Sequence, residues 1–218
     1  MNPRAVKSPR ITDLSEGALL RLLFHDHPLS FRNVQHLGLK PESPIRFSVR
    51  QPFIPALGTR PGDIDALGIL DHRLGTAVAV ESKRLKVKAE TFLTGQVNKI
   101  QELKKGAAQA NSLFAFGFAR TLLLVMTEVD SSELTGVHES FRVPSPEIMT
   151  AITNALANLP LEDGIGVLSF IAVQNTKESF LNRGGFSPQL VLAPRDRRQP
   201  ETLSTTVLEY FGVLSNRT

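Results

Sequence analysis

The sequence of 218 residues contains no cysteine, which excludes disulfide bonds and thiolate metal sites. It also lacks an apolar run of the roughly eighteen residues that a membrane-spanning helix requires. The N-terminal residues are basic and do not contain the apolar stretch of a signal peptide. We therefore expect a protein of the reducing cytoplasm that has no membrane partner.

Several functional motifs are missing as well. The chain has no zinc-ligand spacing, no phosphate-binding Walker loop, no nucleophile elbow of the serine-hydrolase type and no internal repeat. It does carry a formal net charge of +4. An excess of positive charge favours a polyanionic partner, and nucleic acid is the one we expect.

The length of the chain is compatible with one domain. We assign residues 1–11 to a flexible basic arm and residues 12–218 to a single domain, with a C-terminal extension from about residue 175.

Hydrophobic periodicity predicts an α/β fold. Runs that are continuously apolar or alternate predict strands, and apolar residues three or four positions apart predict helices. The predicted strands are 45–50, 64–70, 77–88, 121–127, 165–174 and 189–193. The predicted helices are 12–24, 146–159, 201–213 and 92–117, the last being one long helix or a short helix followed by a long one. Strand, helix and strand in succession form a parallel crossover, so we expect a central mixed sheet flanked by helices on both faces.

The stretch from residue 61 to 83 predicts a hairpin whose strands are buried on both faces. Residues 71–75 have the composition of a turn. A hairpin symmetric about Arg73 pairs Asp71 with Gly75, Asp65 with Glu81 and Asp63 with Lys83. Side chains alternate along a strand, so Asp63 and Asp65 share one face, as do Glu81 and Lys83. A slip of one residue would place these two pairs on opposite faces.

Carboxylates that face each other across two strands have Cβ atoms about 5 Å apart and repel each other. A proton or a cation must relieve that repulsion at a buried strand end. Mg²⁺ takes oxygen ligands and keeps several waters, so one or two carboxylates suffice to hold it. Asp65 and Glu81 are therefore candidate metal ligands, although acids at strand ends are also common as solvated caps.

Asp65 followed by Glu81, Ser82 and Lys83 at the end of an apolar strand resembles the PD-(D/E)XK, or restriction-endonuclease-like, nuclease superfamily. The resemblance covers roughly residues 12 to 130 and implies a restriction-endonuclease-like core. It implies that Asp65 and Glu81 bind Mg²⁺, with Mn²⁺ as an alternative, and that the Ser82 carbonyl joins them. It also implies that Lys83 orients or activates the attacking water.

Three further residues have two readings each. Asp63 is an alternative to Asp65 as the family aspartate, and the spacing to Glu81 favours Asp65. Thr12 or Asp13 would cap the first helix, and Glu16 lies in its first turn. Glu16 is either a capping-type surface acid or the metal-site glutamate that some superfamily members carry on this helix. Gln109 is a surface amide, or the glutamine that related nucleases carry on the helix after the catalytic strand.

Basic residues near the motif are candidate contacts to nucleic-acid phosphates. They are Arg60, Arg84, Lys86 and Lys105. Lys105, Gln109 and Leu113 are spaced four apart and are predicted to share one helix face. Lysines on an exposed strand edge also discourage aggregation, so phosphate binding is not their only reading.

These patterns predict a metal-dependent nuclease, with a DNA endonuclease as the default because most restriction-like proteins cut DNA. The alternative is a nucleic-acid-binding module that does not cleave and acts within a larger defence or repair complex. A third reading is an inert interaction domain. The resemblance also implies a homodimer or a subunit of a larger assembly, because many superfamily members act in one of these forms.

Overall fold

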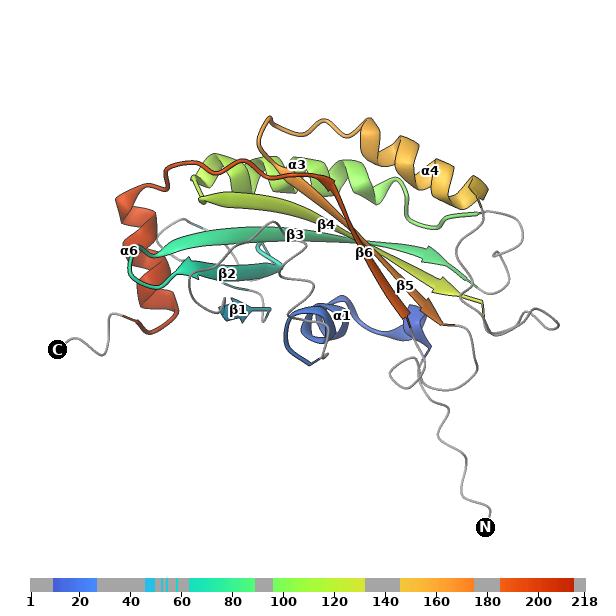
Figure 1. Ribbon diagram of the computed structural model, residues 1–218, viewed down its shortest axis with the longest axis horizontal. Coiled ribbons are helices and arrows are strands. Elements are labelled where there is room, and N and C mark those ends of the chain that lie inside the picture. The colour runs from blue at the N-terminus through green and yellow to red at the C-terminus, as the bar shows by residue number, and fades with distance from the viewer. Residues whose placement is uncertain are drawn as a thin grey trace, which may run out of the picture.

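The computed structural model describes residues 10–26, 46–49, 52, 54, 58, 63–88, 96–131, 146–174 and 185–213. They form an α/β fold around a six-stranded sheet, and the strands lie side by side in the order in which they occur along the chain (Figure 1). The strands are β1 (Arg46–Ser48), β2 (Ala66–Asp71), β3 (Thr76–Val87), β4 (Arg120–Asp130), β5 (Gly166–Gln174) and β6 (Gly185–Leu192). The predicted α/β class is confirmed.

The sheet is mixed, as predicted. β1, β2 and β3 form an antiparallel meander, β3, β4 and β5 are parallel, and β6 returns antiparallel along β5. The parallel steps require crossovers, which the helices α3 (Glu102–Phe116) and α4 (Pro146–Ala157) provide. β3 is the longest strand and lies between β2 and β4.

Helices cover both faces of the sheet (Figure 1). One face packs α3 and α4 against the odd-numbered residues of β3 and β4, such as Leu85 and Leu123. The other face packs α1 (Glu16–Arg21) and the turns beside it against the even-numbered residues, such as Val80 and Leu122. α6 (Glu201–Tyr210) closes a third cluster at the hairpin end of β2 and β3.

The N-terminal helix begins later than predicted. Residues Ile11–Asp13 form a short 3-10 turn, η1, and the side chain of Ser15 caps α1 by accepting from Ala18 N at 3.2 Å. A π-helical turn, η2 (Leu22–Asp26), follows α1. The prediction that Thr12 or Asp13 caps the helix was wrong, because both residues lie in the 3-10 turn and Ser15 supplies the cap.

Arg10 and Ile11 belong to the folded domain rather than to the predicted arm. Ile11 is fully buried, and its N–H donates to Gln174 Oε1 at 2.7 Å. Arg10 pairs with the buried Asp130 at 3.1 Å. Residues 1–9 lie outside the described part of the chain.

The face of α3 was assigned incorrectly. Leu113 is buried, whereas Lys105 and Gln109 are exposed. Each step of four residues turns about 40° around a helix, so Leu113 lies about 80° away from Lys105. The buried face of α3 consists of Leu103, Gly106, Ala107, Ala110 and Leu113.

The C-terminal segment is part of the same fold. β6 completes the sheet, and the buried Gln199 joins the start of α6 to two strands. Its Oε1 accepts from Ala77 N and Ala119 N at 3.0 Å each, and its Nε2 donates to Gly75 O at 2.8 Å. None of the helices within the described ranges is both long enough and apolar enough to cross a membrane.

Replacing Gln199 with alanine should destabilise the domain, because it leaves two buried N–H groups without an acceptor. We expect Gln199→Ala to lower the free energy of unfolding by about 2–4 kcal/mol in urea titrations. Gln189→Ala, at an exposed position of β6, is the control and should change it by less than about 0.5 kcal/mol. Equal values for the two variants would show that the amide of Gln199 stabilises nothing.

Candidate metal and catalytic site

The hairpin has the predicted register over most of its length. Ala66 pairs with Val80 and Ile69 with Ala77, which corresponds to symmetry about Arg73. A bulge between Ile69 and Asp71 shifts the turn end, so that Asp71 pairs with Thr76 and not with Gly75. The reason is local: Asp71 Oδ1 accepts from the N–H groups of Arg73 and Leu74, which tightens the turn.

β2 spans only Ala66–Asp71, whereas β3 spans Thr76–Val87 and therefore extends past the start of β2. The backbone of β3 past Val80 therefore has no β2 partner on that side. Asp65 lies in the bend where β2 starts, and its N–H donates to Val80 O at 3.2 Å. Its Oδ2 accepts from Ser82 N at 2.6 Å. These two bonds place Asp65 opposite Glu81, as the symmetric hairpin predicted.

The side chains of Asp65 and Glu81 do not simply share one face of the sheet. The chain bends at Asp65, and its carboxylate turns along the edge of β3 toward Ser82, whose Oγ lies 3.0 Å from Asp65 Oδ2. Glu81 and Lys83 alternate with Ser82 and point to the face that α3 covers. The acids therefore approach each other around the part of the β3 edge that β2 does not reach, not across a flat surface.

Lys83 places a cation between two oxygen atoms at this edge. Its Nζ donates to Glu81 Oε1 and, at 3.0 Å, to Ser82 O. The N–H and C=O of one strand residue point to the same side, so the Ser82 carbonyl faces the edge where Asp65 binds the Ser82 N–H. One buried serine thus links the aspartate, through its N–H, to the lysine, through its carbonyl.

Glu16 reaches the site from the first turn of α1. Its Oε1 is in hydrogen-bond contact with Ser82 Oγ, which is the same atom that approaches Asp65. The hydroxyl has one proton, so it donates to one carboxyl group at a time. Glu16 therefore contacts the candidate metal ligands through Ser82.

Burial and mutual repulsion raise the pKa values of the acids. Burial is the largest cause for Glu81, the Asp65 carboxylate adds to it, and the Lys83 ammonium offsets only part, so the pKa of Glu81 rises to about 8. Burial also raises the pKa of Asp65, and its hydrogen bond from Ser82 N works against the rise. A second cation near the two carboxylates would relieve both effects.

The oxygen atoms at this edge match the ligands that a hard divalent cation takes. Glu81 Oε2 is buried without a hydrogen-bond partner, and Glu81 Oε1 and Ser82 O already converge on one ammonium. Within the described residues, no three His, Cys, Asp or Glu side chains come close enough to enclose a metal ion. The donor set therefore suits Mg²⁺, which binds through one or two carboxylates and keeps waters, better than a metal that needs a full protein cage.

The residues predicted on α3 lie at the surface. Gln109 and Lys105 are exposed, and Lys105 pairs with Glu102 one turn earlier at 3.0 Å. Their predicted contacts, to a water or a phosphate, would be to groups that approach from solvent. The roles of both residues stay predictions.

Arg84 and Lys86 are engaged within the protein. Arg84 forms a two-point contact with the buried Glu128 of β4, with its Nη2 2.8 Å from Oε2. Lys86 Nζ donates to Thr12 O at 2.5 Å and lies 4.0 Å from Glu128. We therefore assign Arg84 a structural contact, which sequence alternation could not distinguish from phosphate binding.

Two other candidates are less defined. Asp63 is exposed two residues before Asp65, and Arg60 lies outside the described residues.

Sequence reasoning missed three contributors to the site. The Ser82 hydroxyl was not considered beside its carbonyl, and no role was predicted for Gly106 within the helix 92–117. Glu128 fell outside the predicted strand 121–127, whereas β4 extends to Asp130. Alternation continues through Thr127, Glu128, Val129 and Asp130, and this is the signal that would have extended the strand.

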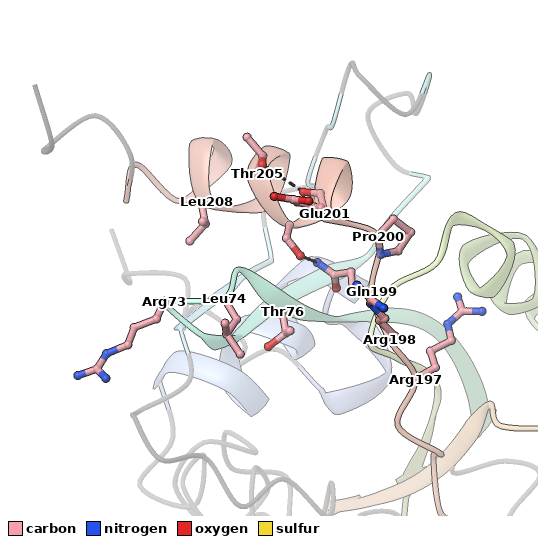
Figure 2. Close-up of a pocket in the computed structure, with 11 residues that line it drawn as sticks. Arg73, Leu74, Thr76, Arg197, Arg198, Gln199, Pro200, Glu201, Thr205 and Leu208 are labelled. Atoms are coloured by element: carbon pink, nitrogen blue, oxygen red, sulfur yellow. Dashed lines mark hydrogen bonds between the residues drawn. The ribbon is translucent and has the colours of Figure 1, made fainter.

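A separate cavity of about 820 Å³ lies at the far end of the hairpin, between its turn and the start of α6 (Figure 2). Arg73, Thr76, Arg198 and Ser204 are among its lining residues, and the side chain of Arg73 extends away from the helix. Arg197 is held by the Phe118 carbonyl at 2.8 Å and by the ring of Phe114. The cavity contains none of the candidate site residues.

Comparison of the chain with protein-family models, with curated proteins and with solved structures gives no match in any of the three. The geometry of the site therefore carries the functional argument.

The raised pKa of Glu81 predicts a pH dependence of stability in the absence of divalent cations. The folded protein holds a proton on Glu81 that the unfolded chain releases near its ordinary pKa of 4.5. Stability from this group is therefore full below that value, falls as the pH rises, and is lost once the pH passes about 8.

Melting temperatures measured in EDTA between about pH 5 and about pH 9 should show this decline. The variant Glu81→Gln should make the decline shallower. Glu209→Gln changes an exposed glutamate of α6 and is the matched control. A parental decline that Glu81→Gln leaves unaltered would contradict the assignment.

Proposed function

We propose that this protein is a Mg²⁺-dependent nuclease that hydrolyses phosphodiester bonds, with DNA as the substrate and internal cleavage as the mode. The observation that carries the proposal is the convergence of Glu81 Oε1 and Ser82 O on the Lys83 ammonium, beside Asp65 at the edge of β3 that β2 does not reach. A mixed sheet with helices on both faces supports the resemblance to restriction-endonuclease-like proteins.

The residues present fit a Mg²⁺ ion, because Glu81 keeps one buried oxygen unpaired. Asp65, Glu81 and the Ser82 carbonyl would hold it, with Mn²⁺ as an alternative. A bound Mg²⁺ supplies Lewis acidity, which polarises a phosphate oxygen and offsets the charge that develops during hydrolysis.

Lys83 has a direct role in this proposal. Two of the three N–H donors of its ammonium go to Glu81 and to Ser82, which leaves one for a water or a phosphate oxygen. A positive charge held beside the scissile phosphate stabilises the transition state more than the ground state, because negative charge grows there during attack. Lys83 therefore orients the attacking water and offsets that charge.

Asp65 is held in place by the backbone. Its bond from Ser82 N fixes the carboxylate just before the start of β2, where a rotamer change would cost that hydrogen bond. Glu16 supports the same position through Ser82 Oγ or acts as a further ligand. Gln109 and Lys105 of α3 are exposed, and in this proposal they would meet substrate from the solvent side.

Plasmid and single-stranded DNA provide the test of cleavage. The purified protein should cut in Mg²⁺ or Mn²⁺, EDTA should stop it, and Lys83→Ala should lower the rate by roughly 100-fold or more while DNA binding persists. Lys104→Ala removes an exposed lysine of α3 and is the control for charge alone.

The other outcomes distinguish the alternatives. A mobility shift without cutting in any metal would identify a binding module in place of an enzyme. Cleavage by Lys83→Ala at the parental rate would remove Lys83 from the mechanism, and the absence of both binding and cutting would leave an interaction domain.

Mg²⁺ binding should itself depend on pH, because a cation can bind Glu81 fully only after the carboxyl has lost its proton. We expect the affinity to increase from pH 6 to above the Glu81 pKa of about 8, with proton release measured by calorimetry in buffers of different ionisation enthalpy.

Asp65→Asn should weaken this binding more than Asp63→Asn, since Asp65 is the aspartate bound to Ser82. The opposite order would make Asp63 the principal ligand.

A further inference from the structure

α3 packs against β3 at Lys83, and a glycine lies at the contact. Gly106 is buried in the middle of α3. A Cβ atom built on it would lie 2.5 Å from Lys83 Cγ, 3.2 Å from Lys83 Cε and 3.2 Å from Leu123 Cδ1. Real Cβ atoms essentially never approach a neighbour to less than 3.0 Å, so the contact with Cγ shows that the backbone of α3 packs directly on the lysine side chain.

The position of the clash along the lysine matters. Cγ is only two bonds from the backbone, so it can move away only if the first side-chain torsion changes, and that rotation would carry the whole side chain with it. The side chain of Lys83 is 17 % exposed, and its ammonium donates to Glu81 and Ser82. The stem thus has α3 on one side and the sheet on the other.

We propose that Gly106 is a positioning residue, which fixes the rotamer of Lys83 and so directs its ammonium to the edge of β3. The inference rests on the proposed nuclease function for its effect on catalysis. Its structural part concerns only the contact between α3 and Lys83.

The choice of residue is unfavourable for the helix itself. Glycine in a helix interior is less stable than alanine because it loses more backbone freedom. The neighbouring positions on the same buried face, Ala107 and Ala110, carry the residue that favours a helix most. At position 106 the lack of space explains why alanine would not serve.

Catalytic rates test the positioning. Gly106→Ala should lower kcat for DNA cleavage by roughly 10- to 100-fold, because a displacement of about 1 Å is enough for a loss of that size. KM, DNA affinity and Mg²⁺ affinity should stay near the parental values, since the variant removes no ligand and no charge.

Gly17→Ala is the matched control. Gly17 is also a helical glycine, in α1, and a Cβ atom there would have no neighbour within 4 Å. We expect this variant to cut at the parental rate. Gly106→Ala at the parental kcat, or a uniform loss of DNA binding and cutting, would overturn the inference.

A stability comparison keeps the inference testable if Gly106→Ala folds poorly. In the parental protein the new methyl group meets Lys83, so Gly106→Ala should lower the melting temperature. In a Lys83→Ala background Cγ is gone, so the same change should be neutral or stabilising. An equal loss in both backgrounds would mean that α3 and the sheet collide without Lys83, and would overturn the inference.

The two measurements separate the inference from the proposed function. If the parental protein cuts no nucleic acid, the nuclease proposal fails, and the melting temperatures still decide whether Gly106 holds Lys83. If the parental protein cuts and the two backgrounds respond alike, the function stands and the inference fails.

Discussion

The backbone of Ser82, which lies beyond the reach of β2, is the constraint on which the candidate site depends. β3 continues past the start of β2, so the Ser82 N–H and C=O must be satisfied by something other than β2. Asp65 takes the first group and Lys83 the second. Because the Ser82 N–H and C=O need hydrogen-bond partners, a carboxylate and an ammonium come to the same edge. Glu81 lies beside them because it is the residue before Ser82 in β3.

Much of this could be predicted from the sequence where the signal was local. The apolar runs on both sides of Arg73 gave the hairpin and its register, and the alternation of Glu81, Ser82 and Lys83 gave their faces. The bulge at Asp71 was out of reach, because it depends on which backbone N–H groups the aspartate side chain accepts from. The direction of the Asp65 side chain, toward Ser82, could not be predicted either. Side chains alternate regularly only within a strand, and Asp65 lies just before β2.

Contacts between distant segments explain the remaining differences. Arg84 has the spacing of a phosphate ligand, and only the pairing of β3 with β4 brings Glu128 within its reach. In the sequence, Gly106 is a residue that destabilises a helix, and only the packing of α3 against β3 brings Lys83 next to it. The sequence shows that a residue is charged or is a glycine. Its role depends on which residue the fold brings next to it.

The order of the strands has a consequence for how the chain assembles. Each strand of the sheet pairs with the one made just before it, so a growing chain always has a docking edge for its next strand. The candidate site is closed early, once α3 and β4 have joined β3. The bond from Ile11 to Gln174 joins residues 163 positions apart and therefore waits for β5. The N-terminal segment can contact β3 and β4 earlier, through Thr12 with Lys86 and Arg10 with Asp130, so the arrival of β5 completes its docking and does not begin it.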